Sequence, residues 1–303
     1  MRFCALILCA LAASTLDWSA TAHSAPPPVA AAKADAQFDH ISVKAIGSGD
    51  PVVLIPGLST PRDVWDGIAP HLARSHRVIL VQVNGFGGDE ARANGKAGTL
   101  DGIVEDIHAY LAANKLGGVS VIGHSMGGLV AMKLALAHPQ SVDRLMVVDA
   151  LPFFGTVMDD KASVESVRPM AETMRSRMLA VADAIGAKAK TPVTSDPGGD
   201  MSRTPENRIR IANWSMKADP AVVAEALYED IVTDLRKDIA TISTPMTILY
   251  HTGGDEAGIS ARIYARDYSA QPRAKLVPVA NSAHFIMLDQ PQRFESEVDE
   301  FLK

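Results

Sequence analysis

The sequence has 303 residues, of which 47% are hydrophobic and 21% are charged, ordinary values for a globular protein with one large core or two smaller ones. The formal net charge of −6 comes from scattered side chains without a basic block, which argues against nucleic acid or an anionic membrane as a partner. The sequence contains no internal repeat and no His-Glu-x-x-His or cysteine-rich metal pattern.

The first 25 residues differ in composition from the rest. Arg2 precedes an apolar run from Phe3 to Ala13, and Ala20-Thr21-Ala22 offers a cleavage site of small residues. The run is about eleven residues long, whereas a membrane-spanning helix needs roughly 20. We predict a signal peptide over residues 1–25 and an exported protein, periplasmic or secreted, without stable membrane insertion once the signal is removed. An uncleaved membrane anchor is the alternative.

Both cysteines, Cys4 and Cys9, lie inside this leader, so the mature chain would contain no disulfide. Its stability would then depend on the hydrophobic core. Residues 26–37 begin with Pro26-Pro27-Pro28 and predict a flexible tether.

Strand and helix patterns alternate after the tether. Val52–Ile55 is a continuous apolar run, typical of a strand buried on both faces. Thr60 is a candidate N-cap with Pro61 at the first helical position, and an apolar stripe follows through Leu72. The same unit recurs with a strand at Val78–Val83 and a helix that Thr99 would cap. Further strands are predicted at Val119–Ile122, Leu145–Val148, Met246–Tyr250 and Lys275–Ala280, and further helices after Gly127, around Ser260–Ser269 and from Pro291.

This alternation predicts an α/β fold, a doubly wound and mostly parallel sheet with active groups at the carboxyl ends of its strands. The alternation of strand and helix patterns stops over residues 151–240. This segment is helix-like in Val164–Ala189 and Pro220–Arg236, with a Pro-, Gly- and Asp-rich loop at Thr191–Pro205 between them. We therefore predict a core from residues 38–150 and 241–303, with residues 151–240 inserted as a helical cap.

Gly123-His124-Ser125-Met126-Gly127 stands between a predicted strand and a predicted helix and has the spacing of a nucleophile elbow. In such a turn the serine backbone is strained, and glycines two positions away on each side prevent collisions. Ser125 is therefore the candidate nucleophile. The pattern has only three fixed residues, and a glycine-rich turn with a passive serine is the alternative.

An acyl-transfer serine needs a base and an orienting acid. His284 follows the last predicted strand and is the candidate base. Asp255 follows the strand before it and is the predicted acid, with Asp149 as the alternative. We interpret four further histidines as structural; these are His108, His124, His138 and His251.

The order Ser125, Asp255, His284 resembles that of α/β-hydrolase fold serine hydrolases with a cap domain. The resemblance covers about residues 38–302 and is strongest at the elbow and at Ser282-Ala283-His284-Phe285. It implies an oxyanion hole from two backbone amides, those of Met126 and Leu58. The family often has His-Gly where this chain has Pro56-Gly57, and that difference makes the assignment of Leu58 weaker.

Six of the twelve methionines fall within the predicted cap, and methionine adapts to varied apolar ligands. We predict substrate contacts from apolar side chains of the cap and from the glycine-rich loop after Val83, although an ordinary helical core explains the cap methionines equally well. The predicted contact residues are Phe86, Phe153, Phe154, Met174 and Met178.

The prediction is a serine hydrolase that cleaves an uncharged, fairly apolar carboxylic ester or lactone, a small-molecule substrate, through an acyl-enzyme and without a cofactor. One alternative is the same triad used for C–C bond hydrolysis, amide hydrolysis or perhydrolysis. Another is a ligand-binding protein that keeps the fold without turnover. The sequence does not determine the oligomeric state.

Overall fold

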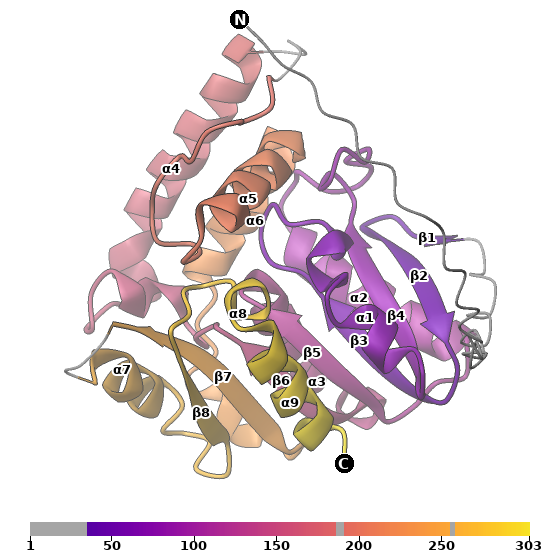
Figure 1. The fold of residues 1–303 in the computed structure, drawn as a ribbon. Helices are drawn as coiled ribbons and strands as arrows, with labels where there is room; N and C mark the ends of the chain where they lie inside the picture. Colours follow the sequence, from indigo (N-terminus) through magenta and orange to yellow (C-terminus); the bar gives the residue numbers. More distant parts are fainter. Residues whose placement is uncertain (1–34, 186–190, 255–257) are drawn as a thin grey trace, which may run out of the picture.

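The computed structural model describes residues 35–185, 191–254 and 258–303, and shows one sheet with helices on both faces (Figure 1). The strand order is β1-β2-β4-β3-β5-β6-β7-β8. The two strands at one edge run antiparallel to their neighbours, and the remaining strands are parallel. The strands are β1 Ala36–Gln37, β2 Ile41–Gly47, β3 Asp50–Ile55, β4 His76–Val83, β5 Val119–His124, β6 Val142–Val148, β7 Met246–Gly253 and β8 Lys275–Ala280.

The central strands are buried on both faces, as the continuous apolar runs predict. Val53 and Ile55 of β3 belong to one hydrophobic core, whereas Val52 and Leu54 belong to the other. Alternate side chains of a strand point to opposite faces, so the strand contributes to both cores.

Helices cover each face. One core receives side chains from α2 Thr99–Ala113, α3 Met126–Ala137 and α7 Ile259–Asp267. The other receives them from η1 Arg62–Trp65, α1 Ala69–Leu72, α8 Ile286–Asp289 and α9 Pro291–Phe301. The short η2 Pro139–Ser141 joins α3 to β6.

The predicted helix from Thr60 to Leu72 was wrong in extent, because two short helices, η1 and α1, take its place. Pro70 has no backbone N–H and its ring crowds the preceding turn, which ends any continuous helix before it. The Thr60 hydroxyl donates to the carbonyl of Leu58 instead of capping a helix.

Thr99 begins α2 but does not cap it. Gly98, with φ of 89°, occupies the N-cap position and offers no capping side chain. The carboxylate of Glu229 instead accepts hydrogen bonds from the amides of Gly98, Thr99 and Leu100, at 2.5, 3.1 and 2.8 Å. A residue 129 positions later in the chain therefore supplies the cap, which no local pattern could predict.

In the described part of residues 151–240 the regular elements are all helical: η3 Phe154–Val157, α4 Val164–Ile185, α5 Pro205–Lys217, α6 Pro220–Val232 and η4 Asp238–Thr241. The three α-helices lie together beside the sheet, at the upper left of Figure 1. Helix α6 is one turn shorter than predicted and ends before Asp234, which forms an ion pair with Arg236 two residues away.

The predicted signal peptide and most of the predicted tether lie outside the described residues. Ala36–Gln37, assigned to the tether, pairs with β2 as β1. Across residues 35–185, 191–254 and 258–303, no helix combines the length and hydrophobicity that crossing a membrane requires.

Candidate active site

Ser125 lies in a strained turn between β5 and α3. Its φ of 54° and ψ of −127° are unfavourable for a residue with a side chain. A Cβ on Gly123 would lie 2.1 Å from the carbonyl oxygen of Gly127, and one on Gly127 would lie 2.4 Å from that of Ile55. Both positions therefore require glycine, as the elbow pattern predicts.

The loop after β3 lies directly beside the serine. A Cβ on Gly57 would be 3.1 Å from the Cβ of Ser125. Leu58 follows in this loop, and Met126 is the first residue of α3, where no carbonyl within the helix accepts from its amide. The two predicted oxyanion-hole residues thus flank Ser125.

His284 follows β8 in a loop that Asp289 holds. The Asp289 carboxylate accepts from the amide of Ala283 at 2.8 Å and from the hydroxyl of Ser202 at 2.5 Å. The His284 imidazole is 21% exposed, and its Nδ1 lies 2.7 Å from Oδ2 of Asp149. The predicted base therefore has one ring nitrogen bound to a buried carboxylate and part of its ring accessible.

The carboxylate beside His284 is that of Asp149, which was the alternative in the sequence-based prediction. Asp255, the predicted acid, lies outside the described residues. Asp149 directly follows β6 with φ of 53°, and its amide donates to the carbonyl of Leu249 at 2.7 Å. The amide of Ser125 donates to Val148 at 2.9 Å, so Ser125 and Asp149 lie at adjacent strand ends.

Asp149 binds two imidazoles. Nδ1 of His251 lies 2.7 Å from Oδ2, and the His251 amide donates to Oδ1 at 3.0 Å. The Tyr264 hydroxyl also donates to Oδ1, at 3.1 Å. Burial alone would raise the pKa of Asp149, but the hydrogen bonds from His251 and His284 hold it well below its usual range. Asp149 is therefore a buried carboxylate that its hydrogen-bond donors keep ionised.

Sequence reasoning missed this role of His251, which it interpreted as structural. The hydrogen bond to Asp149 raises the pKa of His251. His251 lies near the end of β7, and β7 pairs with β6, which Asp149 follows. This neighbourhood could have indicated the contact, but only if the strand order had been known.

His124, the residue before Ser125, contacts the backbone of His284. It is fully buried, and its Nε2 lies 3.1 Å from the carbonyl oxygen of His284, within reach of donation. Burial and the neighbouring His284 lower the pKa of His124 to about 3. His124 is thus a neutral histidine that fixes the His284 loop.

The predicted substrate contacts divide into two groups. Phe86 is fully buried in the core that contains Met126, and Phe153 is fully buried in a separate hydrophobic cluster with α4 and α6, beneath the guanidinium of Arg236. Neither has surface open to a ligand in this structure, because packing against neighbouring side chains covers both. Phe154, Met174 and Met178 are partly exposed, so their predicted contacts stay predictions.

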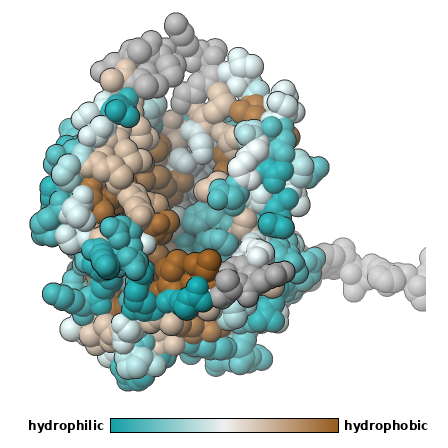
Figure 2. All heavy atoms as spheres, turned by 90° about the vertical axis from the view of Figure 1, so that its left-hand side faces the viewer, coloured by the Kyte–Doolittle hydropathy of each residue, from teal (hydrophilic) through white to brown (hydrophobic). Residues whose placement is uncertain are grey.

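The face of the molecule that carries α4 and α7 is hollowed, and hydrophobic residues surround the hollow (Figure 2). Large apolar side chains exposed on these elements and on the neighbouring η3 segment are Val157, Met158, Met170, Leu179 and Ile259. Apolar surface is therefore available beside the strand ends.

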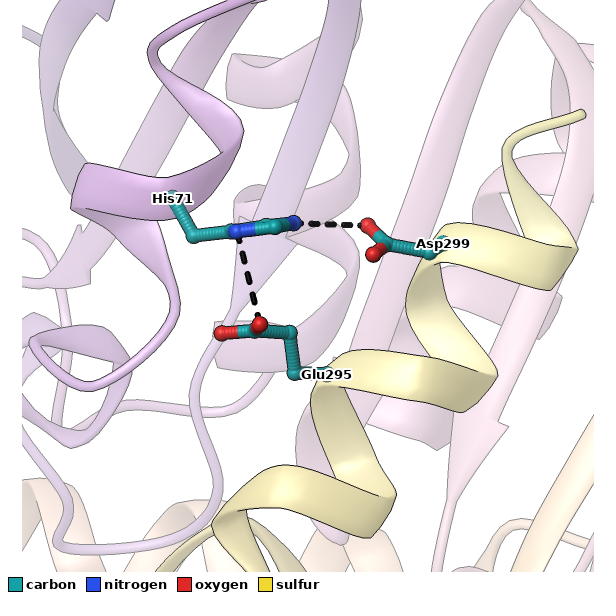
Figure 3. Close-up of side chains that lie close together, drawn as sticks. All are labelled: His71, Glu295 and Asp299. Atoms are coloured by element: carbon teal, nitrogen blue, oxygen red, sulfur yellow. Dashed lines mark hydrogen bonds and ion pairs between the residues drawn. The ribbon is translucent and has the colours of Figure 1, made fainter.

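One group of side chains of metal-binding type occurs among the described residues, on α1 and α9 (Figure 3). Nε2 of His71 lies 2.7 Å from Asp299, and Nδ1 lies 3.5 Å from Glu295 and is also hydrogen-bonded to Arg74. The two ring nitrogens face different carboxylates and a cation stands beside one of them. The group is therefore a polar link between two helices rather than a convergent metal site.

The α/β-hydrolase fold family model matches residues 50–291, and the chain belongs to this family. The predicted fold class is thereby confirmed.

Among curated relatives, the chain is 27% identical to the pimeloyl-[acyl-carrier protein] methyl ester esterase of Aeromonas hydrophila, over 86% of this chain and 99% of that protein. It is 28% identical to the enzyme of the same name from Nitrosomonas europaea, over 86% and 98%. Among solved structures, the enol-lactonase of Burkholderia xenovorans LB400 superposes with a TM-score of 0.65 at 21% identity, over 91% of this chain and 99% of that one.

Proposed function

We propose that this protein is a serine esterase that hydrolyses a small-molecule carboxylic ester through an acyl-enzyme. The observation that carries the proposal is Ser125 at a strained elbow, at the strand end next to that of Asp149, whose buried carboxylate lies 2.7 Å from Nδ1 of His284. Similarity to two methyl ester esterases supports ester hydrolysis as the reaction.

In the proposed mechanism Ser125 Oγ attacks the ester carbonyl, and Nε2 of His284 takes the hydroxyl proton and returns it to the leaving alcohol. Asp149 accepts the hydrogen bond from Nδ1–H, which fixes the tautomer of His284 and stabilises its cation. The amides of Met126 and Leu58 bind the oxyanion. Water, activated by His284, then hydrolyses the acyl-enzyme.

The proposed acid is Asp149 rather than Asp255, because Asp149 is ionised and bound to His284 in the described structure. The surrounding donors are well suited to hold an anion beside an imidazole that becomes charged during the reaction.

A fluorophosphonate probe tests the nucleophile without knowledge of the substrate. An activated Ser125 attacks phosphorus and displaces fluoride, which adds the phosphonyl group to a single tryptic peptide. We expect labelling of Ser125 in the wild type and none in Ser125→Ala or His284→Ala. Hydrolysis of p-nitrophenyl acetate and butyrate tests turnover. Absence of both labelling and hydrolysis in a folded protein would favour the non-catalytic ligand-binding alternative.

We also propose that the protein is exported, on the composition of residues 1–25. Mass spectrometry of the mature protein from a fractionated bacterial host tests this. A mature chain that begins near residue 23 in the periplasm or medium supports export, and an intact Met1 in the cytoplasm contradicts it.

A further inference from the structure

Asp230, in the last turns of α6, is a buried acid without a partner. The residue is 9% exposed, and its carboxylate makes no hydrogen bond or ion pair with any residue that the structure describes. Other buried acids are bound: Glu225 lies 3.3 Å from Arg175, and Asp267 accepts from Arg266 and Thr156. A buried polar group without a partner is costly and calls for a cause.

The position of Asp230 on α6 places it at the boundary between the cap and the sheet, on the side where the parallel strands end. Ala226, one turn earlier, packs into the core that contains Met126 and Leu58. Leu227 and Ile231, on the neighbouring side of α6, pack into the cluster around Phe153. Side chains three and four residues apart share a helix face. Asp230 therefore lies between these two contacts, on the side of α6 that packs against the rest of the protein.

Two anchors fix this helix over the site. Glu229 binds the amides that begin α2, and the amide of Asp219 donates to the carbonyl of Gly85 at 2.6 Å. A Cβ on Gly85 would lie 2.6 Å from the side chain of Val222, so the loop after β4 and α6 are in close contact. The position of Asp230 is therefore set by a packed helix and not by a loop.

The carboxyl group is not sealed inside protein. The described side-chain atoms that are both fully enclosed and without a partner are on Trp65, Asn94 and His124, and neither oxygen of Asp230 is among them. Asp230 therefore opens onto accessible space. The charge of His284 lowers the pKa of Asp230 against the larger opposite effect of burial, so the two groups interact electrostatically.

We infer that Asp230 is a specificity-determining residue whose carboxyl hydrogen-bonds a neutral hydroxyl oxygen on the substrate. The inference rests on the proposed esterase function and specifies its substrate class: esters with a hydroxyl substituent in an otherwise apolar acyl group. A hydroxyl both accepts and donates, so it can satisfy a carboxyl group in either protonation state.

The neutral, protonated form of the Asp230 carboxyl group favours a hydroxyl group on the substrate over an ammonium group. Burial raises the pKa of Asp230 to about 7, so without ligand the group is largely protonated below neutral pH. A cationic substrate would require the ionised form, for which no described residue provides a hydrogen bond.

The test compares p-nitrophenyl esters of butyrate, 2-hydroxybutyrate and 3-hydroxybutyrate in the wild type, Asp230→Asn and Asp230→Leu. Dividing kcat/KM for each hydroxylated ester by that for butyrate, and then comparing proteins, removes the intrinsic reactivity of each ester. We expect this ratio to fall about tenfold or more in Asp230→Leu for at least one hydroxylated ester. Asp230→Asn keeps the shape and the hydrogen-bonding capacity and should retain most of the ratio. It also keeps the inference testable if the leucine variant does not fold.

Asp234→Asn is the matched control, because Asp234 lies four residues further along the chain, just past the end of α6, and is paired with Arg236. It should leave the ratio at the wild-type value. Equal ratios in the wild type and Asp230→Leu would overturn the inference, as would a preference for an aminoacyl ester over both hydroxylated esters.

Failure of the proposed function has a different signature, namely no hydrolysis of any ester by the folded wild type. In that case calorimetry with methyl 3-hydroxybutyrate and methyl butyrate still decides the role of Asp230. Weaker binding of the hydroxylated ester alone in Asp230→Leu supports it, and equal binding by both proteins contradicts it.

Discussion

Asp149 after β6 and Asp230 on α6 are both buried carboxyl groups, yet their pKa values shift in opposite directions. Asp149 is held ionised by donors from His251, His284 and Tyr264, whereas Asp230 accepts from no described residue and burial raises its pKa to about 7. The comparison teaches that burial alone does not decide the charge of a carboxyl group. Donors on the surrounding elements decide it, and they distinguish the proposed catalytic role of Asp149 from the proposed recognition role of Asp230.

The largest expected effect is that of the nucleophile. Ser125→Ala should lower kcat for p-nitrophenyl butyrate by on the order of 10⁶, because the serine forms the covalent intermediate. Binding of the ester, measured by calorimetry, should change little if recognition belongs to the cap. Retained turnover with a normal circular dichroism spectrum would remove the serine mechanism.

Asp149→Asn should lower kcat by about 10⁴, because an amide cannot hold the required tautomer and charge of His284. Asp255→Asn is the matched comparison and should lower kcat much less. Measurement of kcat for both variants with p-nitrophenyl acetate decides between the two acids. A crippled Asp255→Asn beside an active Asp149→Asn would assign the role to Asp255.

The two carboxyl groups also predict opposite dependences of stability on pH. The pKa of Asp149 is lowered by folding, so its contribution is present above about pH 4 and is lost as the pH falls. The pKa of Asp230 is raised to about 7, so its contribution is present below about pH 4 and is lost as the pH rises towards 7.

Asp230→Asn should therefore gain stability relative to the wild type between pH 4 and 7, by roughly 1.4 kcal/mol per pH unit at most, with no further gain above pH 8. Urea unfolding of both proteins across this range measures the difference. A constant difference would show that Asp230 does not change its protonation on folding.

The smallest effect concerns the apolar part of the cap. If Met174 or Met178 contacts the acyl chain, its replacement by alanine should shift the preferred chain length, because each buried methylene contributes up to about fourfold in kcat/KM. Esters from p-nitrophenyl acetate to decanoate measure the profile, with Met170→Ala as an exposed control. Unchanged profiles would exclude both methionines from the pocket.

The core was largely predictable because its signals are local. Apolar runs such as Val52–Ile55 identified buried strands, and the elbow glycines identified the strained turn at Ser125. The strand β2, which lies between β1 and β4, was missed, since Ile41–Gly47 mixes polar and apolar residues at a boundary between tether and core. The cap helices were predicted, but which of their side chains face a ligand was not, since a methionine-rich helix has the same pattern in a core and in a pocket.

By itself, the sequence determined the fold class, the strained turn at Ser125 and the position of His284 after the last strand, because each depends on neighbours in the chain. Only the tertiary structure decided the rest. It brought His251 onto the carboxylate of Asp149, 102 residues away in the chain, let Glu229 cap a helix in the core, and left Asp230 without a partner among the described residues. These outcomes depend on strand order and on the packing of one helix over the sheet edge, and the energy of a buried charge depends on which donors that packing supplies.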